Sequence, residues 1–392
     1  IIVEGDPRGY PIISGSRDVQ GTPTGFRLGI KRFEPMSFDG GHVYVTLDER
    51  IQYAAEKALR EGVERMEAQS GVAIVMDPHS GEILAMADYP QFDPNRFYKA
   101  KDKVRKNSAV VDVFEPGSVF KVFLMASALE EGIVTPGTVI RVPEELQLFN
   151  RTISEAHRRK PGESDRKTAT DILVESLNVG TTMIATQLGE AKYYKYLRGF
   201  GFGQRTGIAL PGESQGLLRH PRDWSAVDIG MMSFGQGVAV TTLQLATAVS
   251  VVANGGMLVR PRIVQYLTDH ESVTVKATPK TSVRRVISEK TARQVREMMG
   301  DVVTHGTGTP ARIRGYSLGG KTGTAQKAAP GGLGYLKNDY VASFISVFPL
   351  HDPQVVIVVA IDTPRKSIWG STVAAPVVRQ IAKTIIETHN IP

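Results

Sequence analysis

The chain has 392 residues, which is enough for one large domain or two of ordinary size. Hydrophobic residues make up 41% and charged residues 22%, and no window approaches the roughly 18 consecutive apolar residues of a membrane span. Cysteine is absent, which excludes disulfide bonds, thiolate nucleophiles and cysteine-based metal sites, and the net charge of +7 comes from scattered residues without interleaved aromatics, so nucleic-acid binding is not expected.

The first part of the chain predicts a linker, a helix and a hairpin. Residues 1–45 are rich in Gly and Pro and contain short strand-like pieces, so we predict a linker or the remnant of another domain. The stretch 49–69 has apolar residues at helical spacing, and Asp48 before it is a suitable N-cap. Two strand-like runs, 71–77 and 81–89, are separated only by PHS and predict a β-hairpin.

The middle of the chain is mixed and mostly helical in pattern to about residue 254, where the sequence ANGG marks a break. After it, 261–267 and 282–287 predict short strands. The segment 288–303 predicts a helix that Ser288 caps.

The C-terminal part contains three strand-like runs, at 316–326, 339–349 and 354–362, and then a helix over about 371–387. The connections between the runs are short, which favours antiparallel pairing. The order of elements predicts an α+β fold: an antiparallel five-stranded sheet covered by the terminal helices, with a helical subdomain beside it.

A lysine interrupts the apolar stretch from Val119 to Leu129, which otherwise predicts a buried helix. A buried ammonium is costly unless it is paired or loses its proton, so we expect a lowered pKa for Lys121. Ser118 lies three residues earlier at the start of the helix, where backbone N–H groups favour a developing negative charge. A neutral lysine beside a weak hydroxyl nucleophile predicts acyl transfer through Ser118.

The same Ser-x-x-Lys spacing occurs a second time, at Ser164 and Lys167. It lies in a charged segment with Pro and Gly, where we expect Lys167 to be solvated and protonated and so unable to act as a base. Because such a short pattern arises by chance, further motifs are needed to distinguish the two.

Two further motifs follow in the chain. Ser176 and Asn178 lie two residues apart at a break between helical patterns, and can line a cleft in which the hydroxyl relays protons and the amide holds a substrate amide. Glycines interrupt the strand-like run near residue 320, as happens where another backbone or a ligand comes close. This third motif consists of Lys321, Thr322, Gly323 and Thr324, in which a lysine flanked by hydroxyls can bind a carboxylate. The combination Ser-x-x-Lys, Ser-x-Asn, Lys-Thr-Gly is typical of β-lactamases and penicillin-binding proteins.

Residues 46–392 resemble the penicillin-recognising serine transpeptidase domain of class B penicillin-binding proteins. The resemblance extends beyond the three motifs to FEPGSVFK, GFGQRTGIALPGE, MSFGQGVAVTTLQ and GYSLGGKTGTAQK. The sequences EPGS and MSFGQG are more similar to those of the septal type, which serves cell division or sporulation, than to those of the elongation type. Residues 1–45 resemble the end of the non-catalytic pedestal domain of such proteins.

The resemblance implies a peptidoglycan D,D-transpeptidase. Ser118 would attack the carbonyl between the two D-alanines of a stem peptide, Lys121 would take its proton, and D-Ala would leave. Ser176 would help to pass the proton to the leaving amine, and Asn178 would hold the substrate amide. A second stem peptide would then take the acyl group, and β-lactams would acylate Ser118.

The third motif would face the terminal carboxylate of the substrate, which makes Lys321, Thr322, Gly323 and Thr324 the expected substrate-binding residues. The backbone N–H groups of Ser118 and Thr324 would form the oxyanion hole. No cofactor and no metal are implied. The expected partners are stem peptides, β-lactams, a polytopic membrane glycosyltransferase and divisome proteins, with an N-terminal membrane anchor outside this chain and the catalytic domain on the extracytoplasmic face.

Two alternatives stay open. In a D,D-carboxypeptidase or a β-lactamase-like hydrolase, water would replace the acceptor amine, although no Glu can be placed as a base for deacylation. A non-catalytic β-lactam-binding scaffold or sensor would keep the fold alone, but such proteins tend to lose the nucleophile, and the set of Ser118, Lys121, Asn178 and Lys321 is intact here.

Overall fold

The computed structural model describes residues 2–3, 41–156, 159, 162–269, 271–329 and 334–389. The predicted linker or pedestal remnant over 1–45 therefore lies mostly outside the described residues. Within them, no helix combines the length and hydrophobicity that crossing a bilayer requires.

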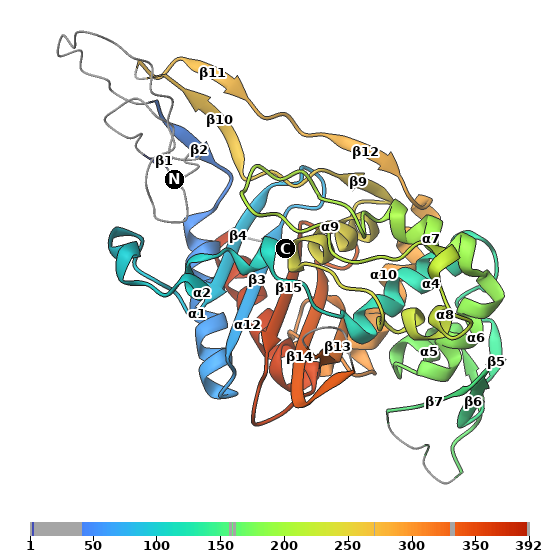
Figure 1. Ribbon diagram of the computed structural model, residues 1–392. Coiled ribbons are helices and arrows are strands. Elements are labelled where there is room, and N and C mark those ends of the chain that lie inside the picture. The colour runs from blue at the N-terminus through green and yellow to red at the C-terminus, as the bar shows by residue number, and fades with distance from the viewer. Residues whose placement is uncertain are drawn as a thin grey trace.

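A five-stranded antiparallel sheet forms the centre of the molecule, with the strand order β13-β14-β15-β3-β4 (Figure 1). Its strands are β3 (Ser70–Met76), β4 (Ile83–Tyr89), β13 (Gly319–Ala328), β14 (Tyr335–Phe348) and β15 (Val355–Asp362). The predicted hairpin, the three C-terminal strands and their antiparallel pairing are confirmed.

Both faces of this sheet are buried along β3, β15 and the second half of β14, which explains why these segments are mostly apolar. Successive side chains of a strand point to opposite faces. In β3, Val72 and Ile74 belong to one core, while Ala73 and Val75 belong to the other. The second core is closed by two helices from opposite ends of the chain, α1 (Glu49–Arg65) and α12 (Ala375–His389).

The terminal helices begin largely as the sequence predicts. Asp48 caps α1 by accepting hydrogen bonds from the backbone N–H groups of Arg50 and Ile51. The predicted C-terminal helix is divided at Ala374 into a short α11 (Gly370–Val373) and the long α12. Ser288 caps α10 (Glu289–Thr304), as predicted.

A helical subdomain covers the first face of the sheet, with the buried helix α9 (Thr242–Ala253) against β3, β14 and β15. Its other described helices are η2 (Pro94–Lys99), α2 (Asp102–Arg105), α3 (Ser108–Val111), η3 (Gly117–Phe120), α4 (Lys121–Glu130), α5 (Ala169–Val174), α6 (Asn178–Leu188), α7 (Glu190–Gly199), η4 (Pro221–Asp223), α8 (Asp228–Ser233) and α10. The short η5 (Thr309–Ala311) instead contacts α11 and α12 in the second core.

Short strands that the sequence did not predict extend from this subdomain. They are β5 (Val139–Arg141) paired with β8 (Arg166–Thr168), β6 (Glu145–Leu148) paired with β7 (Arg151–Ser154), and β9 (Met257–Val259) paired with the predicted β12 (Ser282–Arg285). Strands of three or four residues are too short to show an alternating pattern in a sequence.

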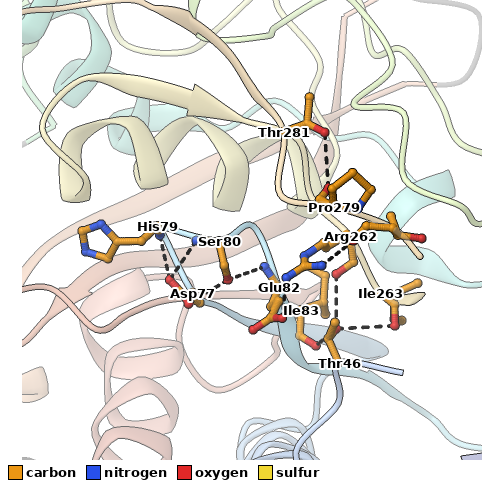
Figure 2. A network of polar contacts seen from close by, with 11 residues as sticks. Thr46, Asp77, His79, Ser80, Glu82, Ile83, Arg262, Ile263, Pro279 and Thr281 are labelled. Atoms are coloured by element: carbon orange, nitrogen blue, oxygen red, sulfur yellow. Dashed lines mark hydrogen bonds and ion pairs between the residues drawn. The ribbon is translucent and has the colours of Figure 1, made fainter. Parts of the chain in front are cut away.

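The start of the domain is fastened to the sheet through a second sheet, in which β1 (Ile2–Val3), β2 (Val43–Val45), β10 (Val264–Thr268) and β11 (Thr274–Ala277) pair in that order. Figure 2 shows the junction. The side chain of Thr46 donates to the Ile83 carbonyl at 2.7 Å, and Arg262 forms an ion pair with Glu82 at 2.6 Å. These contacts join β2, the β3–β4 hairpin and β10 into one unit.

Candidate active site

The segment that carries Ser118 lies against the strand of the third motif. η3 runs directly into α4, and the backbone N–H of Lys121 donates to the carbonyl of Ser118. Gly117 has a φ of +61°, and a Cβ there would lie 2.8 Å from the carbonyl oxygen of Thr324. Only glycine lets the Ser118 segment approach β13 this closely.

Lys121 joins the first motif to the second. It is completely buried, and its Nζ donates to the Ser176 carbonyl at 2.6 Å and to Asn178 Oδ1 at 2.7 Å, with Ser176 Oγ at 3.4 Å. Burial lowers the pKa of Lys121 to about 7, although the negative charge of Glu155 acts in the opposite direction. The expected lowered pKa is confirmed.

The hydroxyl of Ser118 takes part in none of the hydrogen bonds among the described residues, and its side chain is half-buried. Lys121 Nζ instead donates its hydrogen bonds to Ser176 and Asn178. Ser118, the nucleophile predicted from the sequence, therefore lies at the site with no hydrogen-bond partner for its hydroxyl among the described residues. It is three residues from the buried lysine, on the same helical face.

Ser176 connects all three motifs. It lies between α5 and α6 with a φ of +63°, a left-handed conformation that is uncommon for serine and is often found at functional sites. This conformation presents its carbonyl to Lys121, while its Oγ accepts from Lys321 Nζ at 2.8 Å. One hydroxyl thus lies between the amino groups of two buried lysines.

Lys321 is as buried as Lys121. Burial lowers its pKa well below the usual 10.5, and the nearby charge of Lys121 lowers it further. Its neighbours have partners of their own: Thr322 Oγ1 lies 2.8 Å from Thr307 Oγ1, and Thr324 Oγ1 accepts from the backbone N–H of Gly370 at 3.2 Å. An arriving anion would therefore find a buried lysine that lacks a carboxylate partner among the described residues.

The glycines of the third motif are needed for close packing, as the sequence indicates. A Cβ at Gly323 would lie 2.3 Å from Ser343 Oγ and 2.8 Å from the carbonyl oxygen of Pro116. A Cβ at Gly320 would lie 2.5 Å from the ring of Phe344. The expected approach of another backbone at Gly323 is confirmed, since Pro116 precedes the Ser118 segment.

The second Ser-x-x-Lys pair is elsewhere and is built differently. Lys167 is 7% exposed and forms ion pairs with Glu163 and Glu175, each at 2.7 Å, so the expectation that it would be solvated is wrong. Burial alone would lower its pKa, but the hydrogen bonds that Lys167 donates to the two carboxylates raise it above the usual value. Lys167 is thus protonated, as expected, but through ion pairing.

The sequence analysis missed two carboxylates at the site. Glu155 accepts hydrogen bonds from the backbone N–H groups of Asn178 at 2.5 Å and Val179 at 2.9 Å. Glu115, in the EPGS sequence, accepts from the Gly237 N–H at 2.8 Å, and burial raises its pKa. Glu115 could have been suspected from its place three residues before Ser118, whereas nothing around Glu155 gives a signal.

Two cavities border the cluster of motifs. One, of about 750 Å³, is lined by Glu115, Gly237, Ala325 and Tyr335 among others, and so reaches the neighbours of Ser118 and Thr324. The other, of about 550 Å³, reaches Ser176. In the part of the chain that the structure describes, no three His, Asp or Glu side chains come together in a way that could hold a metal ion.

Residues 71–383 match the family model of the penicillin-binding protein transpeptidase domain. The chain is 37% identical over 350 residues to Stage V sporulation protein D of Bacillus subtilis, covering 88% of this chain and 53% of that protein. It is 36% identical over 353 residues to the probable peptidoglycan D,D-transpeptidase PbpC of Pseudomonas aeruginosa, covering 89% and 59%. The chain thus spans little more than half the length of these curated relatives.

The structural comparison agrees with the sequence comparison. The crystal structure of penicillin-binding protein 3 from Mycobacterium tuberculosis in complex with aztreonam matches with a TM-score of 0.85 at 34% identity, covering 93% of this chain and 82% of that one. Similarity of this extent, in sequence and in structure, shows more than a shared fold. The chain belongs to the family of penicillin-binding protein transpeptidase domains.

Proposed function

We propose that this domain is a peptidoglycan D,D-transpeptidase that cross-links stem peptides through an acyl-enzyme on Ser118 and that β-lactams inhibit. The observation that supports this most strongly is the position of Ser176 Oγ between the Nζ atoms of Lys121 and Lys321, at 3.4 and 2.8 Å. A hydroxyl in this position can relay a proton from Lys121, and Lys321 beside it can hold an anion. The names of the relatives and the aztreonam complex of the M. tuberculosis protein are in line with this function.

In the acylation step, Ser118 Oγ attacks the carbonyl carbon of the penultimate D-Ala while neutral Lys121 takes the hydroxyl proton. The backbone N–H groups of Ser118 and Thr324 stabilise the oxyanion. When the tetrahedral intermediate collapses, the C–N bond breaks, and the proton travels from Lys121 through Ser176 Oγ to the departing amine of D-Ala. An ester on Ser118 remains.

In the second step, the amine of another stem peptide attacks the ester carbonyl. The amine gives a proton back along the same path, the ester C–O bond breaks, and the Ser118 hydroxyl is restored. Asn178 holds the amide of the donor peptide, and its Oδ1 contact with Lys121 fixes the base during both steps.

Lys321 is suited to the terminal carboxylate of the donor. A buried lysine with a strongly lowered pKa gains much from a carboxylate partner, because that partner favours its charged form. Thr322 and Thr324 supply hydroxyls beside it, and Gly323 lets Pro116, which precedes the Ser118 segment, pack closely against β13.

A transpeptidase needs room for a donor and an acceptor peptide, and cavities of about 750 and 550 Å³ adjoin the cluster of motifs. A carboxylate that activates water would need a free oxygen near the ester, and both oxygens of Glu155 are engaged by backbone N–H groups. The hydrolase and the non-catalytic scaffold remain as outcomes of the test below.

We also infer a setting in the cell. The substrate lies outside the cytoplasmic membrane, so the domain would work on the extracytoplasmic face, held by an N-terminal anchor outside this chain. A polytopic membrane glycosyltransferase would supply the glycan strands, and divisome proteins would direct the pair to the septum. Co-purification of the complete protein with such a glycosyltransferase from membranes tests this, and recovery without it would count against it.

The function is tested with a stem pentapeptide that ends in D-Ala-D-Ala and an acceptor peptide with a free amine. We expect release of D-Ala together with a cross-linked product, and neither with Ser118→Ala. D-Ala release with only the hydrolysed tetrapeptide would instead identify a carboxypeptidase. No release and no penicillin adduct in the unmodified protein would favour a scaffold.

A further inference from the structure

We infer that Glu155 is a positioning residue for acyl transfer: its carboxylate holds the start of α6 so that Asn178 faces Lys121, and its negative charge acts on Lys121. This inference rests on the proposed function, because it assumes that Lys121 acts on Ser118. Nothing in the three motifs includes Glu155, which lies 21 residues before Ser176 in the chain.

The helix that begins with the second motif lacks a cap of its own. Its N-cap residue is Leu177, which has no side-chain oxygen to accept the free N–H groups of the first turn. Glu155 takes that role from outside the helix. Its two oxygens accept from the N–H groups of Asn178 and Val179 at 2.5 and 2.9 Å, a two-pronged, charge-assisted contact.

The residue before Glu155 fixes the side chain of Asn178. The carbonyl of Ser154 accepts from Asn178 Nδ2 at 3.1 Å, which turns Oδ1 of the same amide toward Lys121 Nζ at 2.7 Å. Ser154 and Glu155 together therefore hold Asn178 by its backbone and by its side chain. Since Lys121 takes its orientation from Asn178 and from the Ser176 carbonyl, the base is held indirectly by the end of β7.

The β6–β7 hairpin is a suitable support for this contact. Its two strands pair from Glu145 opposite Ser154 to Leu148 opposite Arg151. Ile153 is only 4% exposed and belongs to the core of the helical subdomain, so the end of β7 is anchored just before Ser154 and Glu155. The end of this hairpin thus brings Ser154 and Glu155 to the site.

The charges around Lys121 give this role a measurable consequence. Lys321 faces it from β13 across Ser176, Glu155 acts on it from the end of β7, and the groups from the α5–α6 connection, Ser176 and Asn178, are neutral. Burial lowers the pKa of Lys121 and the charge of Glu155 raises it. Removing that charge should therefore lower the pKa of Lys121 further, so that the base stays neutral at lower pH.

Two substitutions separate the two roles of Glu155. Glu155→Gln keeps the size of the side chain and one acceptor oxygen but removes the charge, while Glu155→Asp keeps the charge and both oxygens but is one methylene shorter. The second-order rate of Ser118 acylation by benzylpenicillin is measured from pH 5 to 9 for both. Glu145→Gln, which removes a charge from the same hairpin, is the matched control.

For Glu155→Gln we expect the acid limb of the profile to move to lower pH by about half a unit or more, because an opposite charge near Lys121 is lost. For Glu155→Asp we expect the limb to stay and the plateau rate to fall about 10- to 100-fold, because the geometry is loosened. Glu145→Gln should match the unmodified protein in both respects.

The inference is overturned if the acid limb of the pH profile does not move in Glu155→Gln, even when the plateau rate falls. A falling plateau with an unmoved acid limb is what a purely structural residue would give. It is also overturned if Glu155→Asp retains the full rate. If Glu155→Gln does not fold, the plateau rate of Glu155→Asp decides alone. A missing Ser118 adduct in the unmodified protein would refute the proposed function itself, so the two failures are distinguishable.

Discussion

The rate at which penicillin acylates Ser118 should follow the loss of a proton from Lys121 as the pH is raised. Lys121 is fully buried, and burial lowers its pKa from the usual 10.5 to about 7. Only the neutral amine can accept the Ser118 proton, so the rate is expected to rise tenfold per pH unit well below pH 7 and to level off above it.

The size of the effect follows from the pKa of Lys121. At pH 7.5 a lysine with a pKa of about 7 is roughly three-quarters neutral, whereas one with the usual value would be neutral in about one molecule in a thousand. Burial thus makes the base about 700 times more available. The same lowering corresponds to about 5 kcal/mol, at about 1.4 kcal/mol per pH unit, as the cost of burying the charged form.

The assay uses a fluorescent penicillin that does not titrate between pH 5 and 9. The second-order rate constant of acylation is measured at each pH, since that constant reports the pKa values of the free enzyme. Lys121→Arg is the control, because arginine stays protonated and should lower the rate by about 10²- to 10⁴-fold above pH 7, where Lys121 is neutral, and by less at lower pH.

A profile that is flat from pH 5 to 9 would refute the reasoning, because it would mean that no base titrates in this range. A midpoint above pH 9 would refute it as well, since Lys121 would then keep an ordinary pKa despite its burial. Full activity of Lys121→Arg would show that another group takes the Ser118 proton.

Three further substitutions test other parts of the site and the fold. Gly323→Ala should lower the acylation rate at least about tenfold, because its Cβ would meet Ser343 Oγ at 2.3 Å. Gly137→Ala is the control and should leave the rate unchanged, because no atom lies within 4 Å of its Cβ. Equal acylation rates of the two variants would contradict this. Between pH 7 and 9 the unfolded chain binds more protons at Lys121 than the folded one, so the free energy of unfolding should rise with pH. In urea titrations we expect the difference between the unmodified protein and Lys121→Met to grow by up to about 1.4 kcal/mol per pH unit. A difference that does not change with pH would be evidence against a neutral buried lysine. Arg262→Leu leaves Glu82 without its ion-pair partner and should lower the free energy of unfolding by about 1 to 3 kcal/mol, while the folded protein keeps its acylation rate. Loss of the acylation rate in the folded variant would instead show that the Glu82–Arg262 contact affects the active site.

Much of the central sheet could be predicted because β3, β15 and the second half of β14 are mostly apolar runs with short connections, as expected of strands that are buried on both faces. β13 is instead rich in Gly, Thr and Lys, because it carries the third motif. The caps at Asp48 and Ser288 could be predicted too, because an N-cap depends on local sequence. The break at Ala374 could not, since apolar residues continue across it.

The candidate site was found from the sequence to the extent that its residues form spaced motifs. Lys121 was conspicuous because a charge stood in an apolar run, and the structure brings it to Ser176 and Asn178. Lys167 was misjudged as solvated because one of its two partners, Glu175, lies at the C-terminal end of α5 and meets Lys167 of β8 only once that helix has formed. A partner eight residues away leaves no recognisable pattern.

Glu155 and Thr307 show what spacing alone does not reveal. Each lies in an irregular segment and reaches the site only through the tertiary structure, Glu155 at the start of α6 and Thr307 at Thr322. Supporting residues of this kind are found from contacts, because their positions relative to the motifs are set by loops of variable length.

The most direct test is to incubate the protein with a fluorescent penicillin and then apply a denaturing gel and intact mass spectrometry, with Ser118→Ala and Ser164→Ala beside it. The proposed mechanism predicts one adduct that persists for hours, is lost in Ser118→Ala and is retained in Ser164→Ala. An adduct that survives in Ser118→Ala, or rapid release of opened penicillin, would contradict it.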